Sequence, residues 1–130
     1  MPVTRRPGLA LLVVVLGLAA CGGDDASTAS PSAVAERTIE IRASEYAFNG
    51  DPGVITAGDT IEFAVANVGQ IEHNLEVLSA AGRSLGRTER IPAGSAASVT
   101  VTFDEPGVYR LICDVDDHLS RGQTATITVG

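Results

Sequence analysis

The stretch that decides the fold is VYRLICDVDDHLSRGQTATITV, residues 108–129. It begins and ends with runs typical of β-strands, and the second of these alternates polar and apolar residues with a period of two. Between the two runs, four residues separate Cys113 from His118, and four more separate His118 from Gln123. A loop this short, fixed by a strand at each end, can direct the three side chains toward one point.

The same alternation marks four earlier runs: residues 38–43, 60–65, 74–77 and 98–103. Asparagine, aspartate, proline and glycine separate the runs and supply turns. Short β-branched strands at such spacing predict an all-β sandwich or barrel. The segment least typical of a strand is 80–89, rich in glycine, for which we expect a surface connection or a short helix.

The alternating runs also place most aromatic side chains in the core rather than in a redox role: Tyr46, Phe48, Phe63, Phe103 and Tyr109. Asp59 and Asn67 are interpreted as turn-forming residues.

The N-terminal segment has the layout of a secretory signal. Arg5 and Arg6 precede an almost wholly apolar, uncharged run at 8–20. This run is shorter than the about 20 apolar residues that a bilayer span needs, so a retained membrane helix is the weaker alternative. The sequence Leu-Ala-Ala-Cys at 18–21 resembles a bacterial lipobox, in which the cysteine is lipidated. We therefore predict a signal peptide at 1–20 and a lipid on Cys21; an ordinary signal peptide would also place the protein outside the cytoplasm.

Small polar residues, glycine and one proline predominate after Cys21 and cannot build a core, which predicts a flexible tether at 21–35. Residues 36–130 then form one small domain. The chain has a net charge of −7, and arginine supplies all of its Lys+Arg total of 9. An acidic protein lacks the basic footprint that nucleic acid requires, so nucleic-acid binding is excluded, whereas a positively charged protein partner suits it.

The chain has two cysteines, and the lipid is expected to occupy Cys21. Cys113 then has no disulfide partner in a compartment where thiols usually pair. It is either a buried, inert thiol or a metal ligand. His73, at the start of another alternating run, could be brought alongside it by sheet formation. Two imidazoles and a thiolate with a weak fourth ligand are typical of blue copper; zinc is chemically possible, but the divalent affinity order favours copper.

The ordered set of motifs resembles the small bacterial cupredoxins over nearly the whole domain. The matching segments are 43–48, 57–63, 67–69, His73-Asn74, 91–94, 106–109, Cys113, His118, Gly122 and the final run. The resemblance implies a Greek-key β-sandwich with one copper ion at one end, bound by His73, Cys113 and His118. It also implies that the Asn74 side chain braces the ligand loop.

The sequence departs from this family in two places. Gln123 stands where most members have an axial methionine, and the only methionine is Met1, which would be removed with the signal. Some members use an axial glutamine, and its harder oxygen favours Cu(II), so we expect a lower reduction potential than a methionine ligand would give. Three aspartates also crowd the loop where proline or glycine is commoner: Asp114, Asp116 and Asp117. They form either a solvated acidic loop or a negative rim that steers a cationic partner beside the edge of His118.

We therefore expect a monomeric carrier of single electrons, not an enzyme, held at the outer face of the membrane or in the periplasm by its lipid alone. Its partner would be a redox protein with a basic docking surface. The alternative is a copper storage or delivery protein with the same ligands. An enzyme using Cys113 as nucleophile and His118 as base is disfavoured, because no accompanying acid or oxyanion loop is evident.

Overall fold

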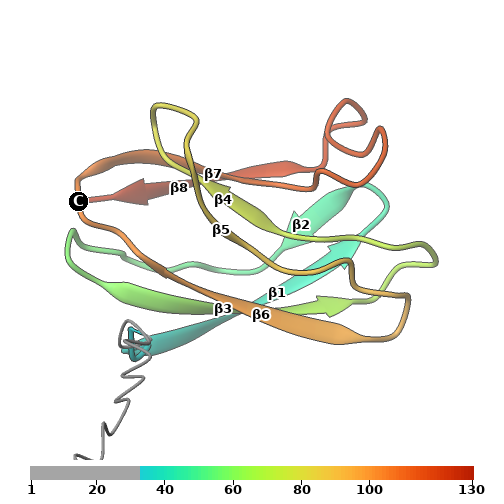
Figure 1. Cartoon of the computed structure of the whole chain (residues 1–130), viewed down its shortest axis with the longest axis horizontal. Helices are drawn as coiled ribbons and strands as arrows, with labels where there is room; N and C mark the ends of the chain where they lie inside the picture. The colour runs from blue at the N-terminus through green and yellow to red at the C-terminus, as the bar shows by residue number, and fades with distance from the viewer. Residues whose placement is uncertain (1–32) are drawn as a thin grey trace, which may run out of the picture. The chain divides into compact units, whose positions relative to one another are not determined.

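The computed structural model describes residues 33–130, and within them eight strands form two four-stranded sheets that face each other (Figure 1). The predicted signal peptide, Cys21 and most of the predicted tether lie outside the described residues. None of the described residues belongs to a helix with the length and apolar character needed to cross a bilayer. The strands are β1 (Arg37–Ser44), β2 (Ala47–Asn49), β3 (Thr60–Asn67), β4 (Glu76–Leu78), β5 (Ser84–Arg87), β6 (Ala96–Thr102), β7 (Gly107–Ile112) and β8 (Thr124–Val129).

The first sheet has the order β2-β1-β3-β6 and the second the order β5-β4-β7-β8. β1 and β3 are parallel, and every other pair of neighbouring strands is antiparallel. The chain crosses from the first sheet to the second after β3, returns for β6 and crosses again for β7. This arrangement confirms the predicted all-β Greek-key sandwich.

The core lies between the sheets, because the alternating strands turn one set of side chains inward. On β1, the residues Ile39, Ile41 and Ala43 are buried while their neighbours are exposed. Phe63 and Phe103 are fully buried and pack edge to face, with ring centroids 6.2 Å apart. Burying an aromatic side chain of this kind contributes about 2 kcal/mol, so these rings are major contributors to the core.

Two predictions about individual segments were wrong. Within 80–89 the structure has a strand, β5, and not a helix or a plain connection. Its Gly86 allows close approach of the two sheets, since a Cβ there would lie 3.0 Å from Cγ2 of Val99 on β6. Glycine is therefore required here for packing between the sheets. Because glycine has a weak strand propensity, the sequence did not indicate a strand in this segment. Tyr46, predicted to be in the core, is only partly buried and lies against His118.

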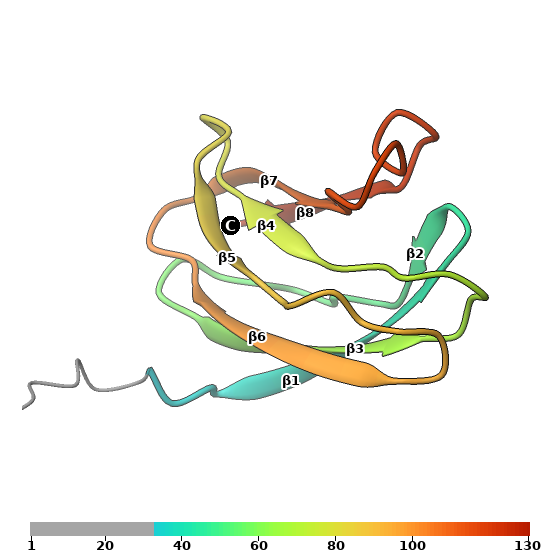
Figure 2. The same cartoon turned by 45° about the vertical axis from the view of Figure 1, so that its right-hand side comes forward.

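The turn between β1 and β2, the connection from β3 to β4 and the loop between β7 and β8 gather at one end of the sandwich (Figures 1 and 2). The C-terminus lies at the opposite end. Three segments far apart in sequence are thus brought together, and two of them, the β3–β4 connection and the β7–β8 loop, carry the predicted metal ligands.

Candidate metal centre

His73, Cys113 and His118 form a compact buried cluster. Their ligand atoms all lie within 4.8 Å of one another, and the three residues are 0%, 0% and 3% exposed. Sγ of Cys113 is 3.5 Å from Nδ1 of His118. The structure therefore brings together the three side chains that the sequence singled out.

Backbone pairing fixes His73 in this cluster. It forms an isolated antiparallel bridge with Ile91, with hydrogen bonds of 3.2 Å from His73 N to Ile91 O and 2.7 Å from Ile91 N to His73 O. This bridge fixes the His73 backbone three residues before the start of β4.

The loop between β7 and β8 is closed on itself by backbone hydrogen bonds. Cys113 follows β7 directly, and its N–H donates to Gln123 O at 3.2 Å. The N–H of Gln123 in turn donates to His118 O at 3.0 Å. Gly122 adopts φ +99°, a left-handed conformation that suits glycine and lets the chain enter β8. All three loop side chains are thereby positioned by main-chain bonds.

Gln123 lies beside the cluster. Its side chain is fully buried, and its Oε1 lies 2.8 Å from Nδ1 of His73. An amide oxygen only accepts, so this contact is a hydrogen bond when Nδ1 of His73 carries the ring proton, and it places Oε1 beside a free nitrogen lone pair when Nε2 carries it. Two imidazole nitrogens, a thiolate and an amide oxygen form a donor set that fits copper.

The comparisons with known proteins agree with this geometry. The family model described as "Cupredoxin-like domain" matches residues 8–129. The chain belongs to this family. Among curated relatives, plastocyanin from Prochlorothrix hollandica is 29% identical over 139 aligned positions, covering 95% of this chain and 90% of the relative. The copper-resistant cuproprotein CopI from Rubrivivax gelatinosus is 25% identical over 115 positions, covering 75% of this chain and 69% of the relative.

Solved structures of auracyanins share the fold of this cupredoxin. The dithionite-reduced auracyanin of Roseiflexus castenholzii superposes with a TM-score of 0.64 at 22% identity, covering 75% of this chain and 99% of the other. Auracyanin A of Chloroflexus aurantiacus, a blue copper protein, gives 0.62 at 20% identity, covering 72% and 98%. The His, Cys and His cluster within this fold is consistent with one copper ion.

Asn74 connects the two parts of the centre. Its backbone N–H donates to Sγ of Cys113 at 3.5 Å, and its side-chain amide exchanges two hydrogen bonds with Asp114. One of these runs from Asp114 N to Asn74 Oδ1 at 2.9 Å. Arg87 pairs with the other oxygen of the Asp114 carboxylate at 3.0 Å. The strand that follows His73 is thus tied directly to the ligand loop.

Burial raises the pKa of the Cys113 thiol above its usual range, although hydrogen bonds from Asn74 and Val115 act in the opposite direction. Without metal the sulfur is therefore protonated at neutral pH. Because copper binds the thiolate, metal binding must release this proton.

The sequence did not reveal three residues around the centre. Oε1 of Glu45 lies 3.3 Å from Nε2 of His73, the ring centroids of Tyr46 and His118 are 5.1 Å apart, and Asn67 is buried with three side-chain hydrogen bonds. Asn67 is thus more than the turn former predicted. The first two residues form the turn between β1 and β2, and only the tertiary fold shows that this turn faces the ligands.

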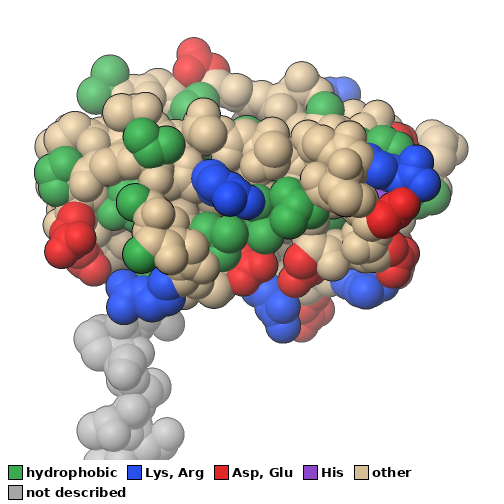
Figure 3. Space-filling model, turned by 90° about the horizontal axis from the view of Figure 1, so that it is seen from above, with side chains coloured by type: hydrophobic (Ala, Val, Ile, Leu, Met, Phe, Trp, Pro, Cys, Tyr) green, Lys and Arg blue, Asp and Glu red, His purple; other side chains and the backbone are tan. Residues whose placement is uncertain are grey.

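The centre approaches the surface at His118. This residue lines a hollow together with Ile71, Pro92, Ala93 and Asp116, among others. Histidine contributes almost no surface to the face seen in Figure 3, in agreement with the burial of His73 and His118. Basic and acidic side chains lie side by side on this face. The hollow gives His118 a partly apolar approach, with the carboxylates of Glu72 and Asp116 in its lining.

The three aspartates of the ligand loop do not form a uniform acidic rim. Asp114 is paired with Arg87 at 3.0 Å, and Asp117 is paired with Arg121 at 2.7 Å. These pairs neutralise much of the local charge, and Asp116 is the aspartate that borders the His118 hollow.

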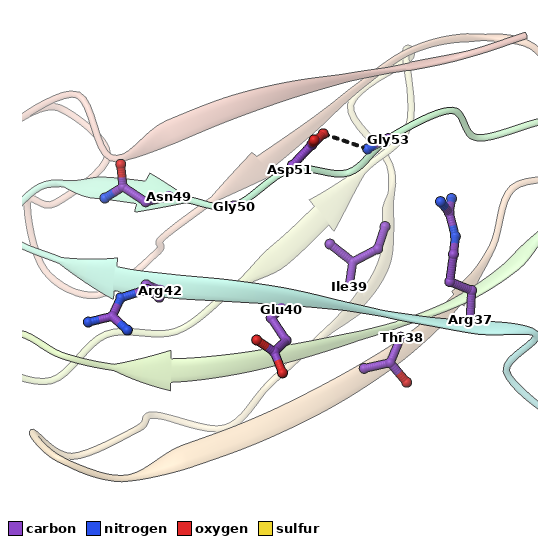
Figure 4. A pocket seen from close by; sticks show the side chains of 9 residues that line it. All are labelled: Arg37, Thr38, Ile39, Glu40, Arg42, Asn49, Gly50, Asp51 and Gly53. Atoms are coloured by element: carbon purple, nitrogen blue, oxygen red, sulfur yellow. Dashed lines mark hydrogen bonds between the residues drawn. The ribbon is translucent and has the colours of Figure 1, made fainter.

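A second hollow, of about 480 Å³, lies along β1 and the segment after β2 (Figure 4). Arg37, Glu40 and Arg42 extend from β1, while Asp51 accepts a hydrogen bond from the backbone of Gly53 at 2.8 Å. No member of the His, Cys and His cluster lines this hollow. The metal centre and this groove are therefore separate features.

Proposed function

We propose that this cupredoxin carries single electrons outside the cytoplasm, with one type 1 copper ion bound by His73, Cys113, His118 and, axially, Gln123. The observation that supports the proposal most strongly is the buried cluster itself, already assembled by backbone hydrogen bonds. Copper in such a site supplies a one-electron Cu(II)/Cu(I) couple. The fixed backbone and the tie from Asn74 to Asp114 hold the donor atoms in place, which keeps rearrangement between the two states small.

The hollow around His118 supports electron entry at its ring edge. Ile71, Pro92 and Ala93 contribute apolar surface to this approach, and the carboxylates of Glu72 and Asp116 also line it. We infer that a redox partner with a positively charged docking surface approaches here, in keeping with the net charge of −7.

Small redox reagents of opposite charge test the docking surface. Asp116→Asn is expected to slow oxidation by a cationic cobalt or ruthenium complex and to accelerate oxidation by ferricyanide, with both effects fading in high salt. Asp104→Asn, at the other end of the sandwich, is the matched control. Equal effects of the two substitutions would refute a local role for Asp116.

The same environment argues against an enzymatic use of the cysteine. A catalytic nucleophile needs an accessible thiolate, whereas Cys113 is fully buried and its pKa is raised by burial. We therefore propose a carrier rather than a catalyst, acting as a monomer.

Spectroscopy of residues 22–130, which contain both sheets and the whole core, tests the copper site. Addition of Cu(II) is expected to give an intense thiolate-to-copper absorption band and a narrow hyperfine splitting in electron paramagnetic resonance. Cys113→Ser should abolish the band. Absence of copper binding would overturn the proposal.

Similarity to the copper-resistant cuproprotein CopI favours copper storage or delivery as a second candidate. Tight Cu(II) binding with a weak, tetragonal spectrum would select this function. Rapid transfer of copper to a chelator, with slow electron exchange, would point the same way.

We also propose that residues 1–20 are a signal peptide, that Cys21 carries the lipid and that 21–35 form the tether. A lipid of this kind anchors a protein firmly, so the full chain should fractionate with membranes of a bacterial host. Cys21→Ala should release it to the soluble fraction. Retention of this variant would instead favour an uncleaved membrane helix.

A further inference from the structure

A carboxylate lies on the side of His73 that faces away from the ligand cluster. Glu45, in the turn between β1 and β2, places Oε1 3.3 Å from Nε2 of His73, while Nδ1 of the same ring faces Gln123 at 2.8 Å. The His73 side chain is fully buried and the Glu45 side chain is 30% exposed. Each ring nitrogen thus faces an acceptor oxygen, and a neutral imidazole, with one N–H, can donate to only one of the two.

The Glu45 carboxylate is itself held in place. Its Oε1 accepts the backbone N–H groups of Gln70 at 2.7 Å and Ile71 at 3.0 Å. Gly69 leaves room for it, because a Cβ at that position would collide with both carboxylate oxygens. The hydrogen bond from Gln70, with others from the backbone and from His73, lowers the pKa of Glu45 to about 2, so the group is an anion at neutral pH.

We propose that Glu45 is a positioning residue for the metal ligand His73: it accepts a hydrogen bond from Nε2–H and thereby directs the lone pair of Nδ1 toward the ligand cluster. The inference rests on the proposed copper site for its effect on copper, but the hydrogen bond itself does not require copper. Neutral imidazole carries only one ring proton, so an acceptor at Nε2 leaves Nδ1 free to bind a metal. An anionic acceptor also makes the ligating nitrogen a stronger donor.

Removal of such a partner typically weakens metal affinity 10- to 100-fold. For Glu45→Ala we therefore expect a Cu(II) dissociation constant raised by about 10- to 100-fold, together with a shift of the reduction potential to higher values. Glu45→Gln keeps an oxygen acceptor and removes the charge, so it should restore much of the affinity.

Two further variants distinguish the effect of the Glu45–His73 hydrogen bond on copper affinity from the effect of a nearby negative charge. Gly69→Ala keeps the carboxylate but displaces it, and should weaken copper binding in the same direction as Glu45→Ala. Glu72→Gln removes one negative charge next to His73 in sequence, from a side chain that is 50% exposed and lies 3.6 Å from Arg90. It should leave the copper affinity within about 3-fold of the wild type, since exposed charges interact weakly through water. If Glu45→Ala and Gly69→Ala change the affinity no more than Glu72→Gln does, the proposal is refuted.

Nitrogen-15 NMR of the metal-free protein provides a readout that is independent of copper. The His73 Nε2–H proton should be visible and protected from exchange in the wild type and in Glu45→Gln, and it should be lost from Glu45→Ala. A wild-type ring protonated at Nδ1 alone would overturn the positioning role even if copper binds. Conversely, a protected Nε2–H in a protein that shows no blue copper spectrum would retain the positioning role while the proposed electron-carrier function fails.

Discussion

The side chain of Asn67 provides the sharpest test of how the fold supports the site. This side chain is 2% exposed at the end of β3. Its amide nitrogen donates to the carbonyls of Ile71 and Ile91 at 2.7 Å each, and its oxygen accepts the N–H of Gly69 at 2.9 Å. Ile91 is the residue that pairs with His73, so Asn67 links the β3 end to the ligand.

Asn67→Ala removes three hydrogen bonds at once. Each hydrogen bond contributes about 1 kcal/mol net, and its loss costs more where the remaining group stays buried without a hydrogen bond. We therefore expect a loss of about 3 kcal/mol in the free energy of unfolding. With a urea slope of about 1.5 kcal/mol per molar, the midpoint should fall by about 2 M. Asn67→Asp should be at least as damaging, because its second oxygen would face two carbonyl oxygens.

Equilibrium urea unfolding of the metal-free protein measures this effect without interference from copper. Exposed Asn49, on β2, is the matched control, and Asn49→Ala should change the stability by less than about 0.5 kcal/mol. A loss below about 1 kcal/mol for Asn67→Ala would show that water or a relaxed loop replaces these bonds, and the reasoning would be wrong.

Three other substitutions test separate features. Gln123→Met should raise the reduction potential, since a thioether favours Cu(I) more than an amide oxygen does; an unchanged value by voltammetry would mean that Gln123 is not a ligand. Gly86→Val should destabilise the fold by about 1–3 kcal/mol in urea unfolding, because its side chain would press on Val99, whereas Ser84→Ala on the exposed part of β5 should be nearly neutral. Glu45 has a pKa near 2 in the fold against 4.5 for a free side chain, so the unfolded chain binds its proton first as the pH falls. The metal-free wild type should therefore lose stability between pH 4.5 and 2 more steeply than Glu45→Gln, as followed by urea midpoints at several pH values; parallel losses would contradict this assignment.

Local patterns predicted much of this molecule because strands with one buried face have a period of two. The run at 124–129 coincides with β8, and the runs beginning at 38 and 60 lie within β1 and β3. The short strands β2 and β5 lacked such a pattern. β5 contains Gly86, and the need for glycine there comes from its close packing against Val99 in the opposite sheet.

The sequence by itself determined three of the candidate ligands, because the short spacing of Cys113, His118 and Gln123 between two strands needs no knowledge of distant segments. His73, 40 residues before Cys113, followed from the family resemblance. Tertiary structure alone decided what surrounds them. Glu45 is 28 residues from His73, and Asn67 is 24 from Ile91, so neither contact follows a local period. Such contacts depend on how two sheets pack and where their loops meet, which is a property of the whole fold rather than of any single stretch of the chain.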